Sequence, residues 1–125
     1  MESVLIVDDD LDLCTVLSED LKEIGYDTSF VTAADKALDF VIENPDTDLI
    51  LLDLKMPGKD GLQFLRELRD KQFETKVIVL TAYADVRSAI DSARYGASDF
   101  ISKPYDLDEL IITMRRVLQK EEHEN

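Results

Sequence analysis

The chain has 125 residues, 45% of them hydrophobic, which is the size and composition of one compact domain with its own core. Its 28 acidic and 14 basic side chains give a formal charge of -14, so nucleic-acid phosphates or an anionic membrane surface would repel it. The single cysteine, Cys14, excludes an intrachain disulfide and a multi-cysteine metal site, and its apolar surroundings indicate packing. No apolar run is long enough for a membrane span or a secretory signal, so we expect a cytoplasmic protein.

A short apolar strand followed by three acids opens the chain. Residues 3–7, SVLIV, form an apolar run that predicts a buried strand. Three carboxylates follow it directly, on Asp8, Asp9 and Asp10. Asp10 also suits the N-cap of an amphipathic helix from residue 11, and Gly25 lies just past the end of that helix. The first strand therefore delivers acids to its C-terminal end.

The second strand and helix have weaker signals. Alternating residues at 26–31 predict a strand. Thr32, with Asp35 three residues later, predicts a capping box at the start of the next helix, which Asn44 and Pro45 end.

Asp53 is the most conspicuous residue of the chain. The apolar run 49–52, LILL, predicts a strand covered on both faces, and it leads directly into Asp53. Pro57 and Gly58 stop the strand, and Asp60 suits the N-cap of the next helix. A carboxylate at the mouth of a parallel sheet is costly to desolvate unless a cation or hydrogen-bond donors meet it. Asp53 is therefore the first candidate for a functional role.

The last two strands also end in polar residues. Residues 76–80, KVIVL, predict a strand that leads into Thr81, and a helix closed by Gly96 follows. Residues 98–102 predict a shorter strand that ends at Lys103.

The chain ends in a helix and a polar tail. Asp106 with Glu109 marks the start of the helix, and residues 119–125 are expected to fray. We predict one domain over residues 1–120, with a polar C-terminal tail at 121–125.

Strand and helix alternate five times, which predicts a parallel sheet with right-handed crossovers. Ligands of such open sheets bind at the carboxyl ends of the strands. The residues that this arrangement brings together are Asp8, Asp9, Asp53, Thr81 and Lys103.

These strand-end residues favour phosphoryl chemistry beside a hard metal ion. Three carboxylates in one pocket repel one another, so they need a divalent cation and Lys103 as positive partners. An all-oxygen ligand set selects an ion such as Mg2+, whereas zinc prefers His or Cys ligands. Asp53 then has an oxygen that can attack a phosphoryl group, while Lys103 and the Thr81 hydroxyl stabilise its charge.

The same residues resemble the receiver domains of two-component response regulators, over nearly the whole chain. Each matching feature is weak alone, but together they are highly specific. They are the pair Asp8-Asp9, Asp53 with Met56-Pro57 and Gly61, Thr81-Ala82, Gly96-Ala97, Phe100 and Lys103-Pro104. The resemblance implies a flavodoxin-like (βα)5 three-layer sandwich, with a five-stranded parallel sheet of order 2-1-3-4-5.

The resemblance also implies a mechanism. Asp53 would accept a phosphoryl group from the phosphohistidine of a sensor histidine kinase or a phosphotransfer protein, in the presence of Mg2+ or, as a substitute, Mn2+. The implied metal ligands are Asp9, Asp53, Asp8 directly or through a water, and the main-chain carbonyl of Lys55. Lys103, whose peptide bond to Pro104 is a candidate for cis, would pair with the phosphoryl oxygens.

Thr81 and Phe100 are the implied switch residues. Thr81 would move toward the phosphoryl group and vacate space for Phe100. The face formed by the fourth helix, the fifth strand and the fifth helix would then change its preference for an output partner, and it is a candidate for a phosphorylation-dependent dimer contact. Phe100 stands where many relatives have tyrosine, so a packing role is the alternative for this ring.

Three other functions fit parts of the pattern. An aspartyl-phosphate phosphatase would use the same chemistry, but no second acid/base carboxylate lies close behind Asp53 and no lid domain is evident. A flavin-binding electron carrier shares the topology, but the acidic turn after the first strand does not suit a phosphate cradle. A degenerate receiver used only for interaction would not bind Mg2+. We therefore predict a phosphoacceptor switch, not an enzyme.

The output is a separate question. The stretches TAYAD, residues 81–85, and GASDF, residues 96–100, resemble receivers attached to transcription activators of the nitrogen-regulation type. A single-domain regulator and an excised receiver are both compatible with this sequence.

Overall fold

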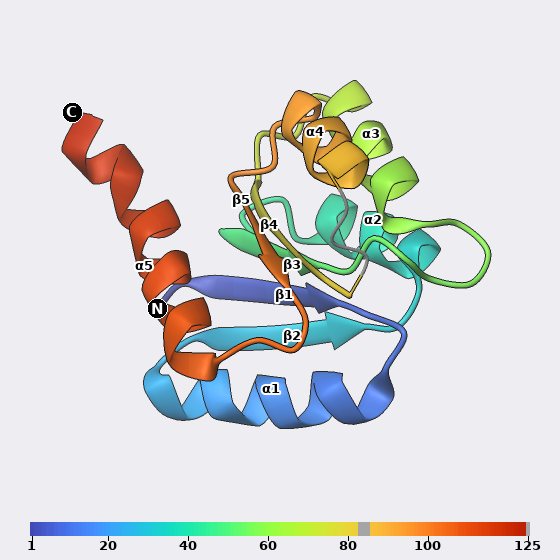
Figure 1. Ribbon diagram of the computed structural model, residues 1–125. Coiled ribbons are helices and arrows are strands. Elements are labelled where there is room, and N and C mark those ends of the chain that lie inside the picture. Colours follow the sequence, from blue (N-terminus) through green and yellow to red (C-terminus); the bar gives the residue numbers. More distant parts are fainter. Residues whose placement is uncertain (83–85, 125) are drawn as a thin grey trace.

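The computed structural model describes residues 1–82 and 86–124, so residues 83–85 of the TAYAD stretch lie outside it. In this part of the chain, five parallel strands form one sheet of order β2-β1-β3-β4-β5, covered by five helices (Figure 1). The strands are β1 (Ser3–Val7), β2 (Asp27–Val31), β3 (Leu49–Leu52), β4 (Lys76–Thr81) and β5 (Asp99–Ser102). The helices are α1 (Leu11–Ile24), α2 (Ala34–Glu43), α3 (Gly61–Asp70), α4 (Val86–Arg94) and α5 (Leu107–Glu124). The predicted strand order and three-layer sandwich are confirmed, and each strand end lies within one residue of its predicted place.

Both faces of the sheet are covered because successive strand residues point to opposite sides. In the central strand β3, Leu49 and Leu51 pack on the side of α1 and α5, whereas Ile50 and Leu52 pack on the side of α2 and α3. All four are fully buried, which explains the continuous apolar run in the sequence. Burial of each such side chain stabilises the fold by about 1.5–3 kcal/mol. Asp53 therefore follows a strand that the core holds from both sides.

The two helices next to the strand ends begin at predicted caps. The carboxylate of Asp10 accepts the main-chain N–H of Leu13 at 3.1 Å at the start of α1. The carboxylate of Asp60 accepts that of Gln63 at 2.8 Å at the start of α3. Gly25, with φ at 119°, ends α1 in the left-handed conformation that glycine adopts without strain. These caps fix the loops that follow β1 and β3.

One prediction at another helix end is wrong. No capping box forms at α2, because Ala33 is its N-cap and no side chain accepts a capping hydrogen bond there. The helix thus begins one residue too late for Thr32 to cap it, and Asp35 instead meets Lys59 at 3.5 Å. Helix α5 continues through Glu124, since Gln, Lys and Glu favour helix and no Gly or Pro interrupts them, and fraying of residues 119–125 stays a prediction.

Helix α4 packs less closely than its neighbours. Ser92 is its one buried residue, whereas Val86 and Ile90 are exposed. At its C-terminal end, Arg69 of α3 donates from Nε to the carbonyl of Tyr95 at 2.7 Å. Polar contacts at that end therefore hold α4, and its exposed apolar side chains are left for other contacts. Nowhere in the described ranges does a helix combine the length and apolarity needed to cross a membrane.

Candidate functional site at the strand ends

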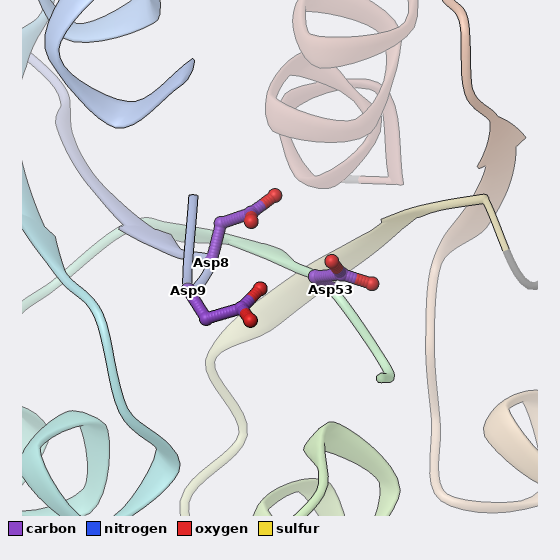
Figure 2. Close-up of side chains that lie close together, drawn as sticks. All are labelled: Asp8, Asp9 and Asp53. Carbon is purple, nitrogen blue, oxygen red and sulfur yellow. The ribbon is translucent and has the colours of Figure 1, made fainter. Parts of the chain in front are cut away.

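The strand order brings Asp8 and Asp53 to the same edge of the sheet. In the neighbouring strands β1 and β3, Val7 lies opposite Leu52. The next residues, Asp8 and Asp53, therefore leave the sheet side by side, and the N–H of Asp53 donates to the carbonyl of Val7 at 2.9 Å. Asp9 follows Asp8, and its carboxylate lies near the other two (Figure 2).

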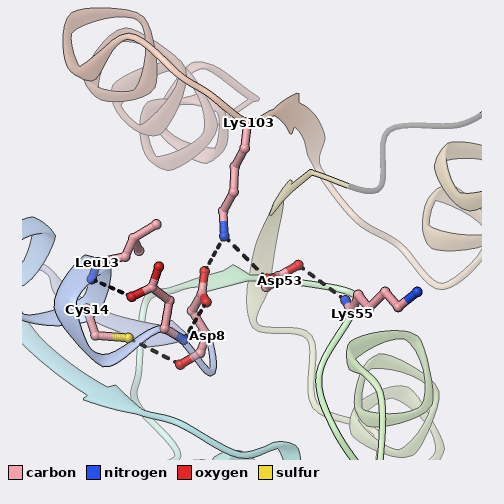
Figure 3. A network of polar contacts seen from close by, with 7 residues as sticks. Asp8, Leu13, Cys14, Asp53, Lys55 and Lys103 are labelled. Atoms are coloured by element: carbon pink, nitrogen blue, oxygen red, sulfur yellow. Dashed lines mark hydrogen bonds and ion pairs between the residues drawn. The ribbon is translucent and has the colours of Figure 1, made fainter.

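Lys103 reaches these carboxylates from the end of β5. Its main-chain N–H donates to the carbonyl of Thr81 at 2.9 Å, which sets the start of its side chain beside β4. Its Nζ lies 2.6 Å from Oδ2 of Asp8 and 3.3 Å from Oδ2 of Asp53, so one ammonium bridges both acids (Figure 3). The peptide bond between Lys103 and Pro104 is cis, in agreement with the sequence-based expectation.

Two of the three carboxylates are buried, and the site has more negative than positive charge. Asp8 is 2% exposed and Asp53 is 8% exposed. Burial raises the pKa of Asp8 above its ordinary value, although the hydrogen bond and charge of Lys103 oppose this shift. Burial alone would lower the pKa of Lys103, but its bonds and charge interactions with Asp8 and Asp53 raise it. One ammonium therefore offsets only part of the charge of three carboxylates, and the excess favours a further cation.

The carboxylates of Asp8, Asp9 and Asp53 fit a small hard cation. One oxygen from each lies within 4.8 Å of the others. Asp8 and Asp53 are buried, while Asp9 is exposed and leaves the group open to water. Such an all-oxygen set, with places for water, is typical of Mg2+ sites. Asp10 is not part of this group, because its carboxylate caps α1 and its N–H donates to Oδ1 of Asp8 at 3.0 Å.

The loop after β3 provides a hydrogen bond to the Asp53 carboxylate. The main-chain N–H of Lys55 donates to Oδ1 of Asp53 at 3.2 Å, so the two carboxylate oxygens have separate partners. The N–H of Gly61 donates to the carbonyl of Leu54 at 2.8 Å and closes this loop. A Cβ on Gly61 would lie 2.1 Å from the main-chain oxygen of Asp53. The role of the Lys55 carbonyl as a metal ligand stays a prediction.

The two candidate switch residues lie on neighbouring strands. Thr81 ends β4 and is fully buried. Phe100 in β5 lies opposite Val79 of β4, and its half-buried ring packs against the core on the side of α2 and α3. A packing role for Phe100 is therefore visible in this conformation, and movement of either residue stays a prediction.

Cys14 is a packing residue, as predicted. It is fully buried, and its Sγ donates to the main-chain carbonyl of Asp8 at 3.3 Å. Burial, with the charges of Asp8 and Asp10, raises the pKa of its thiol to about 11. The thiol is therefore uncharged at neutral pH and supports the turn that carries Asp8.

Sequence reasoning missed Lys59, which lies in the loop between Asp53 and α3. Its Nζ is 3.5 Å from Oδ1 of Asp35 in α2 and forms an ion pair with Oε2 of Glu67 in α3. The spacing from Lys59 to Glu67 crosses a helix start, and Asp35 is distant in sequence, so no local pattern marks this cluster.

The fold and the strand-end carboxylates define a doubly wound α/β protein with an oxygen-rich candidate cation site beside a partly buried ammonium. The model of the response regulator receiver domain family matches residues 4–115, and the chain belongs to this family.

Individual relatives agree with this assignment. Regulatory protein AtoC of Escherichia coli strain K12 is 38% identical over 116 residues, which cover 93% of this chain and 25% of AtoC. The chain thus spans about a quarter of the length of that relative. A CheY-like response regulator receiver domain protein from Methanospirillum hungatei JF-1 has a TM-score of 0.92 at 29% identity, covering 100% of this chain and 99% of the other. Response regulator protein TrrA from Thermotoga maritima, solved in complex with Mg(2+)-BeF, has a TM-score of 0.82 at 34% identity. The match covers 94% of this chain and 100% of the TrrA chain.

Proposed function

We propose that Asp53 is the phosphoryl acceptor of this receiver domain, and that the donor is the phosphohistidine of a sensor histidine kinase or a phosphotransfer protein. The observation that carries the proposal is the placement of the Asp53 carboxylate, held between the Lys55 N–H and the Lys103 ammonium. A carboxylate oxygen of Asp53 forms the bond to phosphorus as the P–N bond breaks and its electron pair returns to the imidazole. Lys103 then balances charge on the phosphoryl oxygens. Each chain takes up one phosphoryl group as an acceptor, without turnover as an enzyme.

Asp8, Asp9, Asp53 and the main-chain carbonyl of Lys55 are the proposed ligands of Mg2+. When bound, Mg2+ supplies positive charge that stabilises the oxygens of the transferring group. The all-oxygen donor set supports this assignment, as does the Mg(2+)-BeF complex of TrrA. Mn2+ would substitute because carboxylate and water ligands also suit it.

The replacement Asp53→Asn is expected to abolish phosphoryl uptake, because an amide oxygen is a poor nucleophile and cannot form the aspartyl phosphate. Wild-type protein incubated with Mg2+ and a small acyl-phosphate donor should gain one phosphoryl group, measured by intact mass. Asp10→Asn is the matched control, since asparagine keeps the N-cap of α1 and Asp10 lies outside the carboxylate group. Unchanged uptake in Asp53→Asn would overturn the assignment.

The affinity for Mg2+ is expected to fall as the pH is lowered from neutrality, and the fall should begin at a higher pH than it would for a site of exposed aspartates. Burial raises the pKa of Asp8 above its ordinary value of 3.8, so its carboxylate takes up a proton at a higher pH than an exposed aspartate would. The proton competes with the metal for this carboxylate. Calorimetric titration with Mg2+ at several pH values measures the effect, and the profile of Asp8→Asn should be flatter. Identical pH profiles for the two proteins would contradict a ligand role for Asp8.

The face formed by α4, β5 and α5 is the proposed contact for an output partner and for a phosphorylation-dependent dimer. Ile90 of α4 is 50% exposed and Ile112 of α5 is 62% exposed. A groove of about 550 Å3 between β5 and α5 is lined by Phe100 and Ile112 together with polar and charged residues, among them Asp99 and Arg116. Apolar side chains exposed on neighbouring elements are typical of binding surfaces. The similarity to regulatory protein AtoC, of which the match covers 25%, supports a regulatory output.

A further inference from the structure

The loop that joins β3 to α3, residues 53–60, carries two groups of the proposed metal site, the Asp53 carboxylate and the main chain of Lys55. We call this segment the site loop. Main-chain contacts fix its two ends, since the Lys55 N–H binds the Asp53 carboxylate and the Gly61 N–H binds the Leu54 carbonyl. Those contacts lie within the loop and its junction with α3. They do not attach its middle to the rest of the domain.

The buried side chains of Leu54 and Met56 anchor the loop in the core, and Lys59 adds a polar attachment. Its side chain is 15% exposed, and its ammonium pairs with Asp35 in the first turn of α2 and with Glu67 in α3. The Oε2 atom of Glu67 is shielded from solvent, and the Lys59 ammonium is the charged group that lies beside it. Because α2 and α3 pack against each other, one ammonium ties the site loop to two helices at once.

We propose that Lys59 is a positioning residue for Mg2+, which holds the site loop against α2 and α3 so that the main chain of Lys55 and the carboxylate of Asp53 are arranged before the metal binds. This inference rests on the proposed metal site. A loop that is already ordered loses less conformational freedom on binding, and its affinity for the ligand is higher.

A simple charge effect would act in the opposite direction. An ammonium near a cation site repels the cation through space, so removal of Lys59 by that effect alone would strengthen Mg2+ binding. Loss of loop positioning would weaken it. The sign of the change in affinity therefore distinguishes the two roles of Lys59.

The first measurement is the dissociation constant for Mg2+ alone, by calorimetry. Lys59→Met is expected to bind Mg2+ roughly 3- to 10-fold more weakly, a smaller loss than for partners that touch a ligand directly. Lys59→Arg, which keeps the charge, should bind nearly as the wild type does. Lys36→Met is the matched control, because it removes an exposed lysine in the same turn of α2 as Asp35. The double variant Lys59→Met/Glu67→Gln removes the shielded carboxylate of Glu67 together with its partner and leaves only the exposed carboxylate of Asp35. It should remain as weak in Mg2+ binding as Lys59→Met.

The second measurement is hydrogen exchange of the Gly61 amide in the metal-free protein. This amide donates to the Leu54 carbonyl and reports closure of the site loop. Its exchange should be several-fold faster in Lys59→Met and unchanged in Lys36→Met. Affinity in Lys59→Met that equals or exceeds the wild type would overturn the role of Lys59, while Mg2+ binding by the wild type would still support the proposed site. A wild-type protein that binds no Mg2+ would overturn both.

Discussion

Replacing Lys103 with methionine is expected to slow phosphoryl uptake by about 100-fold or more at saturating Mg2+, as loss of a group that stabilises transition-state charge commonly does. The same change should leave Mg2+ affinity equal to or higher than that of the wild type. The ammonium lies 2.6 Å from Asp8 and 3.3 Å from Asp53, so it would compete with the proposed Mg2+ for both carboxylates. Rates of phosphorylation by an acyl-phosphate donor, with calorimetric Mg2+ titrations, measure the two effects.

The stability of the metal-free Lys103→Met protein provides a second test. Its free energy of unfolding should fall by about 3 kcal/mol, because two carboxylates would remain buried without their cation. Added Mg2+ should recover most of this loss. Arg116→Met is the control, since Arg116 pairs with Asp99 in β5 but is largely exposed, and its loss should cost about 1 kcal/mol or less. Equal uptake rates in Lys103→Met and the wild type would exclude the proposed role of Lys103.

The strands and the residues at their ends could be predicted because they depend on local sequence. The apolar runs before Asp8 and Asp53 mark strands that are buried on both faces, and a carboxylate after such a run is placed by the strand itself. The strand order is predicted only through the family resemblance. In that order β1 and β3 are neighbours. Given that order, the approach of Lys103 to both acids follows from the carboxyl ends of parallel strands meeting at one edge.

Features that depend on contacts between distant segments could not be read from the sequence. The pairing of Lys59 with Asp35 and Glu67 requires the packing of α2 on α3, which no periodicity specifies. The capping box predicted at Thr32 does not form. Helix α2 has Ala33 as its N-cap, and the Asp35 carboxylate lies beside Lys59, a contact between distant segments. Local propensity is a weak guide where tertiary contacts compete with it.

Gly61→Ala is expected to reduce both stability and phosphoryl uptake strongly. The added Cβ would lie 2.1 Å from the main-chain oxygen of Asp53 and 2.8 Å from Cα of Leu54. Both are backbone atoms at the end of the central strand, so they cannot turn away as a flexible side chain can. Either the start of α3 or the main chain of Asp53 must shift, at a cost of about 2–4 kcal/mol in the free energy of unfolding. Denaturant unfolding and phosphorylation rates at low temperature measure the two losses.

Gly58→Ala separates this close approach from a simple loss of glycine. Gly58 lies in the same loop at φ 76°, and a Cβ there would meet nothing within 4 Å. Its replacement should cost only the strain of a left-handed alanine, about 1 kcal/mol, with phosphoryl uptake largely retained. Equal losses in the two variants would show that backbone strain, not contact with Asp53, accounts for both. A larger loss in Gly61→Ala, above all in the uptake of the protein that remains folded, would show that the approach of α3 to the strand end sets the position of the Asp53 carboxylate.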